Sequence, residues 1–124
     1  MNSALQVGVF TQDAVQKLLA AALVALPASG AVDPHTANRY IITKAGVAAL
    51  TLAAPTAGAD DGLLIQIASA TANAHTVTTA ALFEDGTANT NVLTFPAHAG
   101  ASALLMAYQG KWIVLNEQAT SLTS

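Results

Sequence analysis

Apolar and polar residues alternate along most of the chain from Arg39 onward, and many of the residues are β-branched. A period of two is typical of strands that bury one face. Seven such segments follow one another with turn-forming residues between them, at 39–45, 46–54, 63–70, 75–82, 92–97, 102–108 and 111–118. This spacing predicts an antiparallel β-sandwich, jelly-roll-like, or a small barrel. Because no helical segments alternate with the strands, a parallel sheet is not expected.

The predicted core consists of the larger apolar residues of these strands. Gly46 marks a turn or bulge, and Gln109-Gly110 marks a tight turn between the last two strands. Pro96 places its strand at an edge or an end of the sheet. The core residues that we expect are Ile42, Val47, Leu50, Leu52, Leu63, Ile65, Ile67, Val77, Phe83, Leu93, Phe95, Leu105, Tyr108, Trp112 and Val114.

Before Arg39 the apolar residues recur at helical spacing. Thr11 is a favoured N-cap residue, and the following residues are mostly strong helix formers, so we expect a helix over residues 12–26 that ends at Pro27. The apolar residues at helical spacing would form a stripe along one side of this helix. This stripe could pack on the sheet in the ordinary way or against neighbouring molecules. We take this stripe as the candidate interface: Val15, Leu18, Leu19, Ala22 and Leu26.

The length of 124 residues indicates one domain, with an arm, helix and loop in residues 1–38 and a β domain in residues 39–124. Hydrophobic residues make up 53% of the chain and charged residues only 9%, against about 25% in an average soluble domain. A net charge of −3 leaves little repulsion between copies, which favours association. Four basic residues are too few to follow a phosphate backbone, so nucleic-acid binding is not expected.

The most apolar stretch covers residues 18–28 and is shorter than the roughly 20 residues that span a bilayer. It is similar to the apolar region of a signal peptide. However, only Lys17 lies close before it, and Asp13 offsets that charge. We therefore expect neither a membrane span nor a cleaved signal.

The polar residues do not form a metal-binding pattern. His35, His75 and His98 are far apart in sequence and match no metal-ligand spacing, so turn or surface positions are the simpler interpretation. Asp60-Asp61 lacks the alternating acids and terminal Glu of a calcium loop, and is expected to form a turn. Since the chain has no cysteine, disulfides and thiolate metal sites are excluded.

Catalytic motifs are equally absent from the sequence. The segment 100–104, GASAL, lacks the second glycine of a nucleophile elbow. Trp112 could stack on a ligand, but a tryptophan in a hairpin is more often a core residue. We therefore expect a protein that is not an enzyme and has no cofactor.

Three blocks of the β region carry a resemblance: ITKAG at 42–46, LTLAAPTAG at 50–58 and YQGKW at 108–112. With the residues around them, over about 39–116, they resemble capsid decoration (cement) or head-fibre proteins of tailed bacteriophages. The resemblance implies a symmetric trimer that contacts the major capsid protein on the outer surface of the virion capsid, after synthesis in the cytoplasm of a bacterial host. It carries over no catalytic residue, and the predicted N-terminal helix lies outside it.

Two other functions stay open at this point. The first is a receptor-binding or fibre module of a phage virion, in which the loops 55–62 and 84–91 contact the host. The second is a small metal-dependent hydrolase, which would require His35, His75 and His98 to meet in space.

Overall fold

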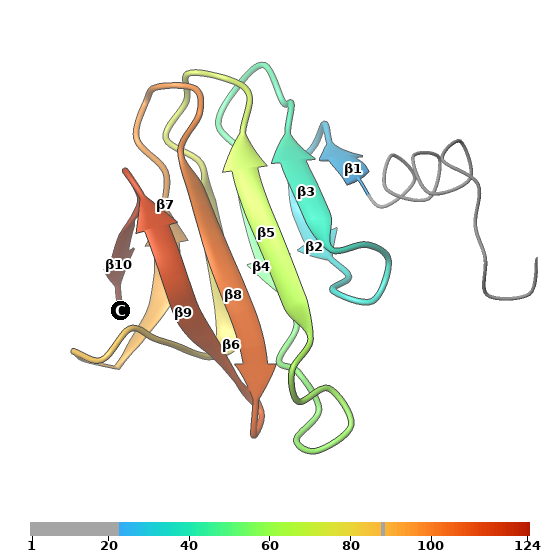
Figure 1. Cartoon of the computed structure of the whole chain (residues 1–124). Coiled ribbons are helices and arrows are strands. Elements are labelled where there is room, and N and C mark those ends of the chain that lie inside the picture. Colours follow the sequence, from blue (N-terminus) through green and yellow to red (C-terminus); the bar gives the residue numbers. More distant parts are fainter. Residues whose placement is uncertain (1–22, 88) are drawn as a thin grey trace, which may run out of the picture.

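The computed structural model describes residues 23–87 and 89–124, which fold into a curled mixed sheet of ten strands (Figure 1). This confirms the prediction of a mainly β protein, and the described residues contain no helix. The strands are β1 Leu23–Leu26, β2 Gly30–Val32, β3 Arg39–Ile42, β4 Ala49–Leu52, β5 Leu64–Ser69, β6 Thr76–Glu84, β7 Thr90–Thr94, β8 Ser102–Tyr108, β9 Lys111–Gln118 and β10 Ser121–Thr123.

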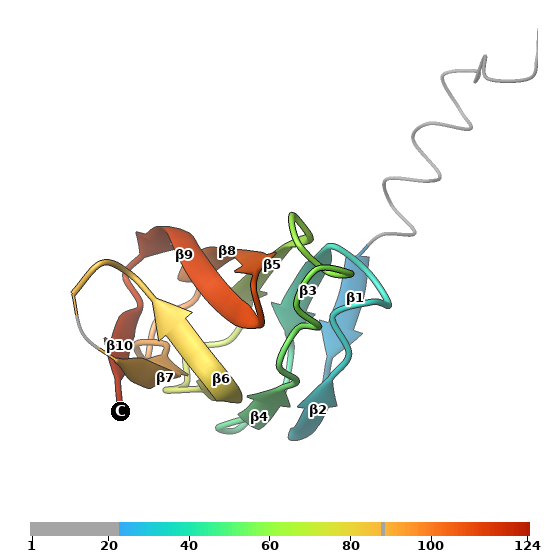
Figure 2. The ribbon, with the colours of Figure 1, turned by 90° about the horizontal axis from the view of Figure 1, so that it is seen from below.

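The first six strands pair in parallel, contrary to the expectation of an antiparallel fold. β1, β3 and β5 form one parallel group, and β2, β4 and β6 form another. Successive strands alternate between the two groups, so the chain coils from one wall of the molecule to the other (Figure 2). A parallel pair needs a crossover connection, which is usually a helix. Here a strand of the opposite wall serves as the crossover, and the absence of helical segments therefore did not exclude parallel pairing.

The last four strands complete the two walls with antiparallel pairs. β8 joins β5 and β9 on one wall, while β7 joins β6 and β10 on the other. A short parallel contact between Phe83 of β6 and Trp112 of β9 links the walls along one side. The β8–β9 hairpin is confirmed. Gln109 and Gly110 have φ angles of +50° and +79° at its tight turn.

The end of the predicted helix is wrong. Residues Leu23–Leu26 form strand β1, which pairs with β3, and backbone pairing in the sheet overrides their helix propensity. Leu26 is partly buried against the core. Val15, Leu18, Leu19 and Ala22 of the candidate stripe lie outside the described residues. β1 and β2, which fall within the predicted arm of residues 1–38, belong to the same sheet as the later strands.

The core lies between the two walls and is built from their inward side chains. Eleven of the fifteen residues expected there are at most 2% exposed, whereas Leu63 and Val114 are partly buried. Val47 and Tyr108 are each 54% exposed, so their assignment to the core was wrong. Both point outward because they have the opposite parity to the buried residues of their segments, Leu50 and Leu105.

Candidate functional site

One wall of the sheet has an apolar outer surface. On β5 and β8 the inward residues are buried, yet the outward residues that alternate with them are also largely apolar. Leu64 pairs with Met106, and Met106 pairs with Ile113, so an apolar row crosses three strands. We call this surface the apolar face, and it consists of Ile41, Leu64, Leu104, Met106, Tyr108 and Ile113.

The outer surface of the opposite wall differs in chemistry. Thr51 of β4 pairs with Thr78 of β6, and Thr76 pairs with Thr94 of β7. We call the surface of these four residues the threonine face. A groove of about 510 Å³ lies at one side of this face, and its lining combines Thr51 and Thr78 with Ala31, Val32, Leu52, Ala53, Thr79, Ala80 and Asn91. A threonine-lined sheet surface is compatible with water, whereas the apolar face exposes groups that are stabilised by burial.

Charged groups near the apolar face stand only at its margins. Arg39 is the exposed first residue of β3, and Lys111 begins β9. The ammonium of Lys111 already lies 3.4 Å from Oε1 of Glu84. Between these margins the outward positions of β5 and β8 carry no charged residue. The centre of the face therefore offers apolar contact and the amides of Gln66 and Asn116, but no ionic contact.

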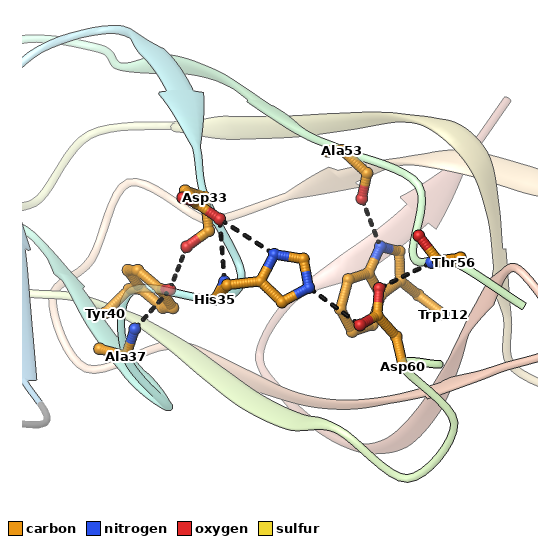
Figure 3. A network of polar contacts seen from close by, with 8 residues as sticks. All are labelled: Asp33, His35, Ala37, Tyr40, Ala53, Thr56, Asp60 and Trp112. Carbon is orange, nitrogen blue, oxygen red and sulfur yellow. Dashed lines mark hydrogen bonds and ion pairs between the residues drawn. The ribbon is translucent and has the colours of Figure 1, made fainter. Parts of the chain in front are cut away.

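A second candidate site is a polar network that joins the 33–38 loop to the 55–62 loop (Figure 3). Nε2 of His35 lies 2.9 Å from Oδ1 of Asp60, and Nδ1 lies 3.3 Å from Oδ1 of Asp33. The other oxygen of Asp60 accepts the backbone N–H of Thr56 over 2.7 Å. The histidine side chain is 58% exposed, whereas that of Asp60 is 13% exposed.

The charges of this network reinforce one another. The hydrogen bond from Asp60, and then its negative charge, raise the pKa of His35 above its usual range, with a smaller contribution from Asp33. The backbone N–H of Thr56, followed by the hydrogen bond with His35, lowers the pKa of Asp60. The backbone N–H of His35 is the main cause that lowers the pKa of Asp33. The geometry thus favours an imidazolium between two carboxylates.

This arrangement suits a clamp better than a catalytic base. A histidine base needs one ring nitrogen free to take a proton from a reacting group. In His35 both nitrogens face carboxylates, and Asp60 is held in turn by the backbone N–H of Thr56. The sequence indicated only that Asp60-Asp61 forms a turn, and the contact with His35 could not be foreseen from residues 25 positions apart.

Further hydrogen bonds fix the same two loops to the sheet. The hydroxyl of Tyr40 donates to the carbonyl of Asp33 and accepts the N–H of Ala37. The indole N–H of the fully buried Trp112 donates to the carbonyl of Ala53 over 3.1 Å (Figure 3). Trp112 is therefore a core residue, as the simpler interpretation had it.

Asp61, next to Asp60, ties the 55–62 loop to the β8–β9 turn. Its carboxylate accepts the backbone N–H and the side-chain amide of Gln109, each over 2.8 Å. The loop is thus held from both sides, by His35 and by Gln109. The two aspartates that the sequence assigned to a turn have separate partners and separate roles.

The three histidines occupy different environments. His35 and His98 are exposed, while His75 is fully buried, so the expectation of turn or surface positions does not hold for His75. Within residues 23–87 and 89–124, no group of three or more histidine or acidic residues could hold a metal ion. The same part of the chain contains no helix that is long and apolar enough to cross a membrane.

Comparison with known proteins gives no relative from which a role could be transferred. No family model matches the chain, and no curated protein is significantly similar to it. The function must therefore be argued from the surface and the contacts of this chain.

Proposed function

We propose that this protein is a structural virion protein that decorates and stabilises a tailed-phage capsid by bridging major capsid protein subunits, as a trimer. The observation that carries the proposal is the apolar face on a chain with very few charges. Such a surface gains free energy when other protein surfaces cover it. A capsid cement protein works in this way, because a protein that binds only the assembled shell stabilises that shell by mass action.

The resemblance to decoration and head-fibre proteins supports the same proposal. Two of its three blocks, at 50–58 and 108–112, contact one another through the hydrogen bond from Trp112 to Ala53. They also flank Asp61, which binds Gln109. These two blocks thus meet at one end of the fold.

The loop network suits a mechanical role. A decoration protein must keep its contact surfaces in one shape while the shell is under load. His35 clamps the 55–62 loop to the 33–38 loop, and Asp61 clamps it to the β8–β9 turn. In this proposal the network has no chemical step to perform, and it serves to hold the end of the sheet in place.

A receptor-binding or fibre module of a phage virion is the alternative. The observation in its favour is a hollow of about 230 Å³ beside the turn between β6 and β7, lined by Glu84, Gly86, Thr87 and Asn89. This hollow lies in the loop 84–91 that the sequence marked as a candidate contact with the host. Its polar lining could accept hydroxyl groups of a glycan.

Co-sedimentation with capsids tests the proposal. The full chain is mixed with expanded capsids assembled from the major capsid protein of the same phage, and binding is followed by gradient centrifugation and electron cryomicroscopy. We expect density at repeated positions between capsomers and a higher melting temperature of the shell. Adsorption of the free protein to host cells, without binding to capsids, would favour the fibre module and contradict decoration.

Residues 1–22 can be tested in the same assay. Deletion of residues 1–22 keeps all of β1, whereas a deletion to residue 26 would remove a strand of the sheet. We expect the shorter deletion to abolish capsid binding while the β fold is retained. Full decoration by this variant would show that the contact with the shell lies elsewhere.

A further inference from the structure

The two outer surfaces of the sheet differ in how much exposed apolar surface they carry. Leu64 and Tyr108 are 44% and 54% exposed at the apolar face, and the row of Leu64, Met106 and Ile113 carries no polar side chain. On the opposite wall the corresponding row mixes Thr51 and Thr78 with Ala31 and Val92. The contrast lies within one molecule, so it is not explained by the overall apolar composition. The apolar face is the surface that requires cover.

The chemistry of the apolar face limits what can cover it. A charged partner would find no counter-charge at its centre, because Arg39 and Lys111 stand at the margins and Lys111 is paired with Glu84. The desolvation of an unpaired partner charge would cost free energy. The complementary surface is therefore apolar and uncharged, with an amide or hydroxyl to meet Gln66. The apolar face of another copy has these properties.

The size of the face fits a weak self-association. Four strands at a spacing of about 4.8 Å and about seven residues of about 3.4 Å each give a patch on the order of 450 Å². Two such patches, taken as flat, remove roughly 900 Å² from water when they meet. A specific interface is expected to bury about 1,000 Å² or more.

We propose that the apolar face binds a second copy of this chain and is the surface through which the protein self-associates. The assignment deepens the proposed function and rests on it for the decoration role. Two copies that meet through the same face form a closed two-fold pair, so a trimer requires a second contact as well. Leu104 lies near the centre, since its row runs from Arg39 through Gln66 to Leu104 and Asn116. The threonine face and its groove stay free for a different partner.

Charge placed on the two faces gives a matched test. Leu104→Glu puts a carboxylate at the centre of the apolar face, and Thr78→Glu puts one on the threonine face. Both residues point outward, both are partly exposed, and both lie on strands with a neighbour on each side. Native mass spectrometry of the full chain should give a multiple of 12.5 kDa for the wild type and for Thr78→Glu. Leu104→Glu should give the single-chain mass with an unchanged circular dichroism spectrum.

A crosslink keeps the test valid even if Leu104→Glu does not fold. The chain has no cysteine, so Leu104→Cys and Thr78→Cys each introduce a single thiol. Packed sheets lie about 10 Å apart, within the reach of a short bismaleimide. We expect a covalent pair at micromolar protein from Leu104→Cys and little from Thr78→Cys. Equal yields from the two variants, or a single-chain mass for the wild type, would overturn the proposal.

The outcomes also separate this inference from the proposed function. A wild type that is a single chain in solution but still binds capsids would remove the self-association surface and leave the decoration role standing. A wild type that associates through Leu104 but binds no capsid would keep the surface and remove the decoration role.

Discussion

The imidazole of His75 accepts the backbone N–H of Ala48 through Nδ1 over 2.9 Å, although the two residues are 27 positions apart. Because Nδ1 is the acceptor, the ring carries its proton on Nε2, which lies 2.8 Å from Oγ1 of Thr71 and donates to it. The ring also meets Phe95 edge-on. This contact fastens the start of β6 to the residue that precedes β4.

We expect His75 to make the fold sensitive to acid. Burial, with a smaller contribution from the charge of Lys44, lowers the pKa of His75 below 6.5, so the folded state holds the ring neutral. The stability that it contributes is present above about pH 6.5, where the unfolded chain is also neutral, and is lost as the pH falls through the lower folded pKa. Protonation would place a second donor against the N–H of Ala48.

Urea unfolding of His75→Ala and of the wild type at about pH 7.5 and about pH 5 checks this, since the two pH values bracket the ordinary histidine pKa. At the higher pH the variant should be less stable by about 1–3 kcal/mol, because the N–H of Ala48 loses its partner. At the lower pH the difference should shrink. His35 titrates both in the wild type and in His75→Ala, so its contribution cancels from the difference between their free energies of unfolding. The exposed His98→Ala is the control, and a constant difference between His75→Ala and the wild type would contradict the prediction.

His35 should respond to pH in the opposite direction. The hydrogen bond and charge of Asp60 raise its pKa above 6.5, so the clamp is complete below about pH 6.5 and is lost as the pH rises through the raised folded pKa. NMR titration of the imidazole should give a midpoint above 6.5 in the wild type. Asp60→Asn should move that midpoint down. Asp61→Asn is the matched control, because its carboxylate binds Gln109 rather than His35; an equal effect of both variants would argue against the clamp.

The strands after Arg39 could be placed from the sequence because period two is a local signal. β8 and β9 lie at the residues that the pattern marked, and the inward residues of β5 are the expected ones. What the pattern could not supply is the partner of each strand. Parallel pairing of β3 with β5 depends on contacts across more than 20 residues, and no residue type encodes it locally. β2 and β10, with three residues each, are too short for the period to show, and the residues of β1 fit the helical spacing that was predicted for them.

The candidate site was missed for a related reason. In β8, SALLMAY, apolar residues occupy both parities, so alternation does not reveal which face is buried. Small residues, Ala103 and Ala107, point inward with Leu105, while Leu104 and Met106 point outward. This arrangement fits the space beside Trp112, which only the assembled sheet defines. A strand that is apolar on both faces was the available signal for the apolar face.

The segment 46–54 offers the sharpest test of which side chains point into the core and which point outward. The sequence placed both Val47 and Leu50 in the core, but they have opposite parity, and Val47 is 54% exposed whereas Leu50 is 2% exposed. Leu50→Ala should lower the free energy of unfolding by about 2–5 kcal/mol, because it leaves a cavity against Val77 of the neighbouring strand. Val47→Ala should change it by no more than about 0.5 kcal/mol. Urea unfolding followed by Trp112 fluorescence measures both, and a larger loss from Val47→Ala than from Leu50→Ala would mean that this segment pairs one residue out of this register.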